Sequence, residues 1–306
     1  MAKKKFYRPI LFGLMIFLKG IFSFMPFEAA FHFAGFMGRL AFRLIQKERA
    51  KTLAHLKIAF PDKSQKELEQ LGAEVFQNYG YIAAELAFFD KLLPRLSEII
   101  SVTGREILDE VMRQGKGGIA IVSHLGNWEF LGGYLTLLGY PGVVIGRRIY
   151  YDKYDKILVG IRNKMKLRTI YRDESSRAIL RALKEKNFVG FVVDQDVETV
   201  DGVYAEFFGR PAYTPSAPIR LALRLDIPVT PFFIVREGMK HRIIIEPPLE
   251  LVKTGDVEKD ILVNTQQWVT IQENYIRRYP QCWVWNHKRW KTALKSVIAS
   301  PKGEAI

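Results

Sequence analysis

Short apolar runs that alternate with helical patterns are the feature that most constrains how this chain of 306 residues folds. Beyond residue 100 the apolar runs have strand lengths, and the segments between them repeat their apolar residues at helical spacing. The segments predicted as strands are 119–122, 143–145, 188–193, 229–235 and 241–246, and those predicted as helices are 128–138, 175–186, 215–225 and 263–278. This alternation is typical of α/β proteins. The sequence therefore predicts a mostly parallel central sheet flanked by helices.

The first 47 residues differ in composition from the rest of the chain. They contain one acid, Glu28, against eight bases, and ten of the 21 Phe lie between Phe6 and Phe42. A basic tip precedes an apolar run over 10–18, and after one lysine the run continues over 20–27. A basic, aromatic and apolar composition of this kind favours contact with an anionic membrane surface.

Four interpretations of this N-terminal run compete. A cleaved signal peptide requires a small-residue cleavage site, and none follows the run. A spanning helix needs about 20 apolar residues, which Lys19 and Pro26 interrupt. A buried helix of a soluble core does not account for the missing acids, so we favour an anchor that lies in or dips into the membrane interface. The chain is accordingly divided into a membrane-anchoring helical segment over 1–60 and a second domain over 61–306.

A capping-box spacing marks the start of the first predicted helix of the second domain. Ser64 and Glu67 have the Ser-x-x-Glu spacing directly after a turn, and the helix is expected to run to about Phe89. Glu85 lies in the apolar C-terminal half of this helix. We interpret it as a solvent-facing or paired carboxylate rather than a catalytic group.

The candidate catalytic motif is His124 and Glu129, which follow the strand predicted at 119–122. Five residues apart on one continuous helix, their side chains would point about 140° apart, so they can meet only if His124 lies in a loop that turns at Gly126. The carboxyl end of a strand is where open α/β sheets bind ligands. A carboxylate on one imidazole nitrogen would leave the other free to take a proton. The alternative is that His124 caps the helix and that Glu129 merely favours its first turn.

The chain offers no convincing nucleophile of its own. Ser123 is not part of a Gly-x-Ser-x-Gly motif, and the one cysteine, Cys282, lies in a segment without other features of a cysteine hydrolase. We therefore expect the substrate to supply the nucleophile, a hydroxyl activated by His124. The transfer would then be direct, without a covalent enzyme intermediate.

Metal and cofactor sites are not indicated by the sequence. The five histidines form no zinc-like pair, and no nucleotide-binding glycine motif is present. Asp194, Gln195 and Asp196 follow the strand predicted at 188–193 and offer carboxylates of the kind that hold magnesium. We favour the interpretation that they shape the site, so neither a metal nor a cofactor is expected.

The surplus of positive charge indicates an anionic partner. The chain carries 46 Lys and Arg against 32 Asp and Glu, a formal charge of +14. Basic residues follow the predicted strand ends, Arg147 and Arg162 among them, and would form an electropositive funnel for phosphate if they gathered beside His124. A nucleic-acid-binding protein is a competing interpretation, but no nucleic-acid-binding motif is present and the apolar N-terminus argues against it. A lipid-binding protein without catalysis is a third interpretation.

Several blocks occur in a recognisable order along the chain. They are the basic and apolar N-terminus, Arg49 to Pro61, the His-x4-acid motif from His124 to Glu129, Arg162 within 160–164, 193–196, 207–211, 227–236 and 273–290. On these blocks, residues 5–292 resemble the bacterial lipid A biosynthesis acyltransferases, the late lauroyl and myristoyl transferases of the lysophospholipid acyltransferase superfamily. Cys282 and the residues before Ala59-Phe60-Pro61 depart from the family pattern, and neither departure touches the His-x4-acid motif.

The resemblance implies a glycerolipid acyltransferase-like α/β fold, with an acyltransferase domain over 61–306. It implies that His124 is the general base and that Glu129 is its partner. The residues expected to bind substrate are Arg147, Arg162, Asp194 and Gln195.

The same resemblance implies transfer of a fatty acyl chain from acyl-acyl-carrier-protein to a hydroxyl of a lipid A precursor of the Kdo-lipid IVA type. The expected partners are acyl carrier protein, the anionic lipid acceptor and the bacterial inner-membrane surface, with the catalytic domain on the cytoplasmic face. Acyl-CoA stays open as the donor, and a lysophospholipid, an aminolipid or another glycolipid stays open as the acceptor, because the His-x4-acid motif is shared. An apolar groove is expected to hold the acyl chain.

Overall fold

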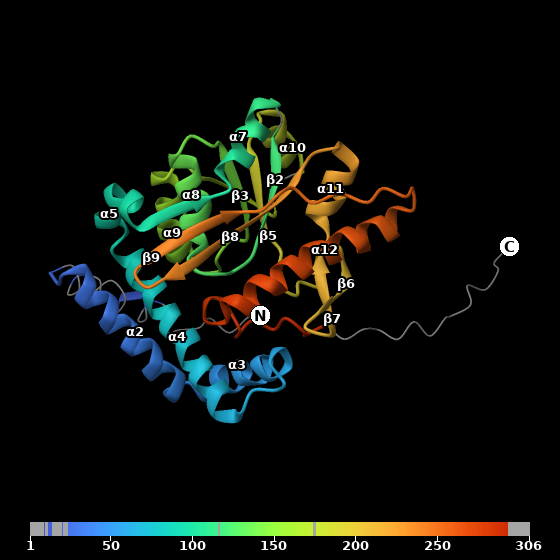
Figure 1. Cartoon of the computed structure of the whole chain (residues 1–306). Helices are drawn as coiled ribbons and strands as arrows, with labels where there is room; N and C mark the ends of the chain where they lie inside the picture. The colour runs from blue at the N-terminus through green and yellow to red at the C-terminus, as the bar shows by residue number, and fades with distance from the viewer. Residues whose placement is uncertain are drawn as a thin grey trace.

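A seven-stranded sheet forms the centre of the molecule, with the strand order β1-β9-β8-β2-β5-β3-β4. The structure, a computed structural model, describes residues 9, 12, 13, 20, 24–115, 117–173 and 176–292. The strands of this sheet are β1 (Ile100–Thr103), β2 (Gly118–Val122), β3 (Gly142–Gly146), β4 (Arg168–Tyr171), β5 (Phe188–Val192), β8 (Val229–Glu237) and β9 (Lys240–Ile245). β8 and β9 pair antiparallel, and the other neighbouring strands pair parallel. The predicted mostly parallel sheet is therefore confirmed (Figure 1).

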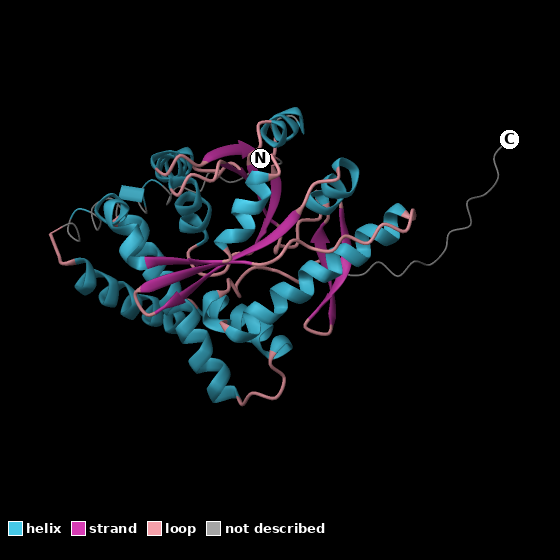
Figure 2. Ribbon diagram, turned by 45° about the horizontal axis from the view of Figure 1, so that its top comes forward, coloured by secondary structure: helices cyan, strands magenta, loops and turns pink. Residues whose placement is uncertain are grey.

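Helices cover both faces of this sheet (Figure 1 and Figure 2). Alternate residues of β2 enter two different cores: Ile119 and Ile121 point into one, whereas Ala120 and Val122 point into the other. The helices that follow β1 are α7 (Arg105–Arg113), α8 (Trp128–Leu137), α9 (Asp152–Lys164), α10 (Ser176–Lys184), α11 (Ala217–Leu225) and α12 (Val257–Arg278). α7, α8 and α9 pack into the core that contains Val122, and α10, α11 and α12 pack into the other.

Among the described residues, the long helices that precede the sheet are α2 (Phe27–Leu44), α3 (Gln46–Ala59) and α4 (Gln65–Ala87). α4 begins with the predicted capping box, in which Ser64 and Glu67 bond reciprocally to each other's backbone. α2 runs alongside α4, where Phe31 stacks on Tyr81 with 4.0 Å between the ring centroids (Figure 1). The shorter elements are α5 (Phe89–Leu92), η1 (Leu93–Arg95), α6 (Leu96–Ile99), the hairpin β6 (Gly202–Phe207) and β7 (Arg210–Pro215), and η2 (Pro280–Cys282).

The N-terminal apolar run lies largely outside the described residues, so its mode of membrane association stays a prediction. Within the part of the chain that the structure describes, no helix combines the length and the apolar character needed to cross a bilayer. The boundary that we placed after residue 60 falls in the turn between α3 and α4.

Two glycines allow the backbones of α2 and α4 to touch. A Cβ atom on Gly80 would lie closer than 3.0 Å to the carbonyl oxygen of Ala34, and one on Gly38 would meet the carbonyl oxygen of Phe76 in the same way. Because backbone atoms cannot yield as a flexible side chain does, we expect Gly80→Ala to push the helices apart. The free energy of unfolding should fall by about 1–3 kcal/mol, which urea unfolding would measure.

Gly160 provides the control for this prediction. It lies within α9, and a Cβ atom there would meet nothing within 4 Å. Gly160→Ala should therefore raise the free energy of unfolding by roughly 0.5–1 kcal/mol, the usual gain from replacing a helical glycine. Equal, small effects of the two substitutions would contradict the close contact between α2 and α4.

Candidate active site

His124 and Asp194 meet at the carboxyl edge of the sheet because their strands are adjacent and in register. Val122, the last residue of β2, pairs with Val192, the last residue of β5. His124 and Asp194 each follow two residues later, and Nδ1 of His124 lies 2.6 Å from Oδ1 of Asp194. Strand register therefore brings together two side chains that are distant in the sequence.

The carboxylate of Asp194 is buried and accepts several hydrogen bonds. Its Oδ2 accepts from the backbone N–H of His124 at 2.7 Å, from Oγ of Ser123 at 3.0 Å and from Nε1 of Trp283 at 2.9 Å. Burial opposes ionisation of this carboxyl, but the charge of His124 and the bonds from His124 and Trp283 outweigh it, so the pKa of Asp194 is held below its usual range. An ionised Asp194 fixes the orientation of the His124 ring.

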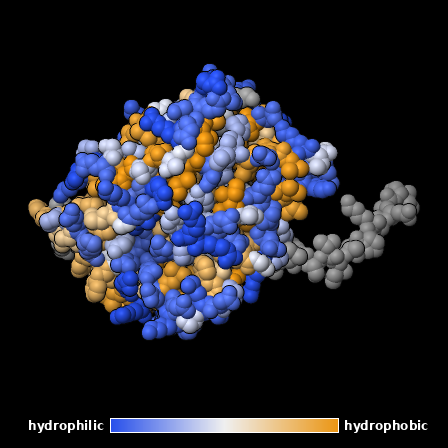
Figure 3. Space-filling model, in the orientation of Figure 1, coloured by the Kyte–Doolittle hydropathy of each residue, from blue (hydrophilic) through white to orange (hydrophobic). Residues whose placement is uncertain are grey.

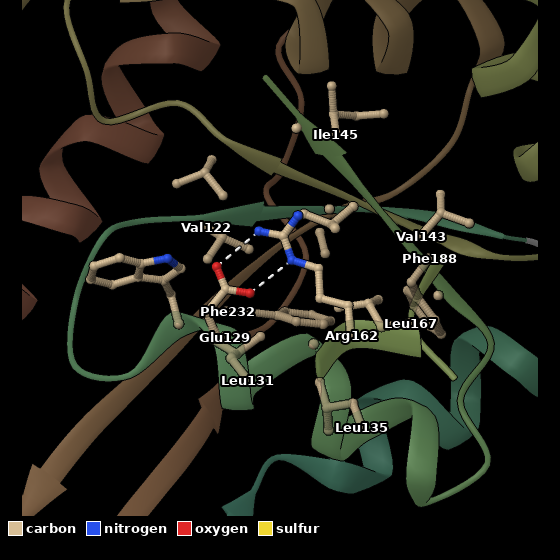
Figure 4. A pocket seen from close by; sticks show the side chains of 18 of the residues that line it. Val122, Glu129, Leu131, Leu135, Val143, Ile145, Arg162, Leu167, Phe188 and Phe232 are labelled. Carbon is tan, nitrogen blue, oxygen red and sulfur yellow. Dashed lines mark hydrogen bonds and ion pairs between the residues drawn. The ribbon is translucent and has the colours of Figure 1, made fainter. Parts of the chain in front are cut away.

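Glu129 is paired with Arg162, and this corrects the expected contact between Glu129 and His124. Nε of Arg162 lies 2.7 Å from Oε2 of Glu129, and Nη2 lies 2.8 Å from Oε1 (Figure 4). Among the described residues, no hydrogen bond joins Glu129 to His124. The physical reason is that α9 places a guanidinium opposite the first turn of α8, where it bonds to both carboxylate oxygens, while the loop after β5 supplies His124 with a different carboxylate.

An apolar pocket opens beside this edge of the sheet. Its volume is about 470 Å³, and it lies between the sheet and the helices α8 and α9 (Figure 4). His124, Glu129, Arg147, Arg162 and Gln195 line its polar part. The apolar lining comes from strands and helices alike and includes Val122, Leu131, Leu135, Val143, Ile145, Leu167, Phe188, Gly190, Val192 and Phe232.

Five of the six site residues predicted from the sequence therefore line one pocket. Asp194 is the sixth, and it lies behind His124 rather than on the pocket wall. Arg147 is exposed at the rim. Asp196, the other carboxylate of the strand-end motif, accepts from the backbone N–H of Thr292 at 2.7 Å and from its hydroxyl at 2.6 Å. Within the described ranges, no three His, Cys, Asp or Glu side chains are grouped to hold a metal ion.

His287 is a site residue that the sequence did not single out. Its ring lies nearly perpendicular to that of His124, with 5.2 Å between centroids. Nε2 of Gln195 lies between them, 3.2 Å from Nε2 of His124 and 3.4 Å from Nε2 of His287. Burial, together with the repulsion from His124 whenever that ring is protonated, lowers the pKa of His287 to about 4, so the His287 ring is neutral near pH 7.

The buried neutral ring of His287 should make stability depend on pH. An unfolded histidine titrates near 6.5, so between pH 6.5 and about 4 the unfolded chain binds more protons than the folded one. The free energy of unfolding should therefore fall as pH is lowered through this window. His287→Gln should flatten that part of the curve, as measured by urea unfolding at a series of pH values. A variant curve parallel to that of the wild type would contradict the assignment.

Comparison with known proteins shows which family the chain belongs to. The family model described as "Bacterial lipid A biosynthesis acyltransferase" matches residues 2–292. The chain belongs to this family. It is thus an enzyme that transfers acyl groups.

Two lipid A biosynthesis enzymes align with this chain over most of their length, and a third acyltransferase aligns over about half of its length. The lipid A biosynthesis lauroyltransferase of Escherichia coli is 24% identical over 285 residues, covering 89% of each chain. The lipid A biosynthesis myristoyltransferase of the same organism is 24% identical over 269 residues, which is 86% of this chain and 81% of the relative. A phosphatidylinositol mannoside acyltransferase of Mycobacterium tuberculosis is 24% identical over 171 residues, which is 55% of this chain and 53% of the relative.

Proposed function

We propose that this enzyme transfers a fatty acyl chain from acyl-acyl-carrier-protein to a hydroxyl of a lipid A precursor of the Kdo-lipid IVA type. One observation carries the proposal: a histidine held by a buried carboxylate stands at the polar end of a pocket whose remaining walls are apolar. General-base catalysis needs the first of these features, and recognition of an acyl chain needs the second. The lauroyl and myristoyl transferases named above support a fatty acyl chain as the group transferred and a lipid A precursor as its acceptor.

His124 would act as the general base in a direct transfer. With Nδ1 bonded to Asp194, its Nε2 takes the proton of the acceptor hydroxyl as the oxygen attacks the thioester carbonyl. The new carbon–oxygen bond forms, the carbon–sulfur bond breaks, and the thiolate leaves with the proton that Nε2 returns to it. The negative charge of Asp194 stabilises the imidazolium that exists between these two proton transfers.

Arg162 and Arg147 would bind the negatively charged groups of the substrates. Glu129 holds Arg162 in one orientation through two bonds, and Nη1 of Arg162 lies 3.3 Å from Oγ1 of Thr169. A guanidinium fixed in this way suits an oxyanion or a phosphate. Arg147 stands at the rim, where a phosphorylated acceptor would meet the protein first.

The acyl chain would lie along the sheet. Successive pocket residues of β5 on the same face are Val192 near His124, Gly190 in the middle and Phe188 at the start of the strand. The distance from the first to the last is about 13 Å at the usual rise per strand residue. The chain would thus run from the catalytic edge toward Phe188, away from solvent.

Residues 1–60 would hold the enzyme on the cytoplasmic face of the inner membrane. α2 exposes several large apolar side chains: Phe36 is 61% exposed and Leu44 is 69% exposed. Pale orange surface marks this part of the molecule at the left edge of Figure 3, where Figure 1 places α2. Arg39 and Arg43 on the same helix suit anionic head groups.

The decisive test is acyl transfer by the purified protein. Acyl-carrier-protein and acyl-CoA thioesters of several chain lengths would be offered with a Kdo-lipid A precursor, and product masses would be followed. Product formation that disappears in His124→Ala supports the proposal. Transfer to phosphatidylinositol mannosides or to a lysophospholipid instead would keep the chemistry and overturn the acceptor. Turnover that is unaffected by His124→Ala would overturn the mechanism.

A further inference from the structure

We propose that Asn127 is a positioning residue that ties the loop carrying His124 to a buried ion pair between Glu85 and Arg236. This inference rests on the proposed function in taking His124 as the base. Neither Glu85 nor Arg236 lines the pocket beside His124. The effect of the ion pair on the reaction would pass through the loop between β2 and α8.

The ion pair joins three parts of the fold. Glu85 of α4 and Arg236 of β8 share two bonds, of 2.6 Å from Nη1 to Oε1 and 2.7 Å from Nη2 to Oε2. Nε2 of His241, on β9, lies 2.8 Å from Oε1 of Glu85. Arg236 also stacks beside the rings of Phe31 and Tyr81, which belong to α2 and α4. The N-terminal helices, the sheet and the loop therefore meet at one buried charge pair.

Asn127 links this pair to the catalytic loop. Its Nδ2 donates to Oε2 of Glu85 at 2.8 Å, and its side chain is fully buried. Asn127 occupies the N-cap position of α8, where asparagine usually caps its own helix, yet its side chain makes no capping bond. Capping would use Oδ1, which has no hydrogen-bond partner among the described residues, whereas Nδ2 is held by Glu85. The bond to Glu85 thus orients the Asn127 side chain and fixes where the loop enters the helix.

The rest of the loop is held by the segment that follows α12. The backbone N–H of Gly126 donates to the carbonyl of Cys282 at 2.9 Å, and Leu125 forms an isolated bridge with Trp283. Gly126 has φ +58°, and a Cβ atom there would lie closer than 3.0 Å to the carbonyl oxygen of Ile234. Only a glycine fits this close approach without strain. The bond from Asn127 to Glu85 adds to these contacts, and together they restrain the backbone of the loop that carries His124.

Burying the charges of Glu85 and Arg236 costs desolvation free energy, so the ion pair needs a reason other than stability. Glu85 is 1% exposed and Arg236 is 8% exposed. Burial opposes ionisation of Glu85, but His241 and Arg236 outweigh it and lower its pKa to about 2, so the pair is charged at neutral pH. A buried ion pair often contributes no more stability than well-packed apolar side chains would. Its directional bonds can, however, fix a loop where apolar contacts would let it slide.

Asn78 offers a matched control. Like Asn127 it is a buried asparagine that bonds to the ion pair, since its Oδ1 accepts from Nε of Arg236 at 2.8 Å. It belongs to α4, however, and among the described residues no hydrogen bond joins its side chain to the catalytic loop. Asn127→Ala and Asn78→Ala remove one hydrogen bond each from the same ion pair. A role confined to fold stability predicts the same result for both.

The experiment compares the two variants in steady-state acyl transfer and by NMR of the His124 ring. We expect Asn127→Ala to lower kcat by about 10- to 100-fold with little change in KM, the size of loss that a small misplacement of a catalytic group causes. Asn78→Ala should keep kcat within about twofold of the wild type. The ring resonances of His124 should move in Asn127→Ala and stay in Asn78→Ala. Equal losses of kcat that follow the two melting temperatures would overturn the proposal.

The test must also work if the alanine variants fail to fold or if no acceptor supports turnover. Asn127→Ser and Asn78→Ser leave smaller cavities, and they would replace the alanine variants if those failed to fold. If no acceptor supports turnover, the proposed function fails, but the NMR comparison still tests the positioning. His124 resonances that are unchanged in the folded Asn127 variant would then overturn it.

Discussion

Asp194→Asn is expected to lower kcat for acyl transfer about 10⁴-fold, because an amide in place of the carboxylate would favour the wrong tautomer of His124, as in a Ser-His-Asp triad. The bond of 2.6 Å from Nδ1 to Oδ1 makes Asp194 the group that sets that tautomer in this structure. The asparagine has nearly the same shape, so binding of both substrates should change little. Steady-state kinetics with a saturating donor would measure the loss.

Glu129→Gln should have a smaller effect, of the order of 10- to 100-fold. It weakens the bidentate hold on Arg162 and leaves His124 with its partner. If Glu129→Gln instead abolishes turnover while Asp194→Asn retains it, Glu129 orients the base in the working complex, as the His-x4-acid motif alone implied.

Stability must be separated from catalysis in these variants, because Asp194 is buried and accepts four hydrogen bonds. Ser123→Ala provides the control. It removes the bond of 3.0 Å to the same carboxylate without touching the imidazole. Its melting temperature should fall slightly, while kcat should stay within about threefold of the wild type. A large loss of kcat in Ser123→Ala would contradict the view that the imidazole bond carries the effect.

The comparison of Glu129 with Asp194 shows where sequence reasoning reached its limit. The sequence correctly placed the loop of His124 after a buried strand, because apolar runs and helix signals are local. It chose Glu129 as the partner of His124 because that carboxylate is near in the sequence. The true neighbour depends on β2 pairing with β5, with Val122 opposite Val192, and strand order is a property of the whole sheet.

Other omissions have similar causes. α9 was not predicted, because its apolar residues are interrupted by the charges of Asp152 to Lys164, yet it supplies Arg162 to the pocket. The sequence assigned no catalytic role to His287, whereas the chain after α12 returns across the catalytic loop through Trp283 and brings this ring to His124. A run of tryptophans within a basic segment was the available signal, since such residues are seldom all exposed.

The length of the acyl chain should be set by the side chains of β5 that face the pocket, and Gly190 is the position where this is testable. It lies between Val192, near the catalytic edge, and Phe188 at the start of the strand. A Cβ atom on Gly190 would find its nearest neighbour, the carbonyl oxygen of Val143, at 3.4 Å, so the Cβ atom fits without displacing the backbone. A larger side chain at this position would project into the part of the pocket that the acyl chain is expected to occupy.

Gly190→Val should therefore shift preference toward shorter donors. Each buried methylene contributes about 0.8 kcal/mol, so a donor that loses burial of two methylenes loses about 1.6 kcal/mol, or roughly fifteenfold in kcat/KM. Phe188→Ala should act in the opposite direction by opening the far end. A competition between donors that differ by two carbons, read as the ratio of product masses, would measure both changes.

Val189 separates this effect from general damage to the strand. It lies next to Gly190 but faces the other core, where it is fully buried. Val189→Ala should lower stability by about 1–3 kcal/mol through the cavity that it leaves, while the ratio of products stays that of the wild type. An altered ratio in Val189→Ala, or an unaltered one in Gly190→Val, would place the end of the acyl chain elsewhere. The pocket along β5 would then hold a different part of the substrates, and the base would have to be approached from the rim at Arg147.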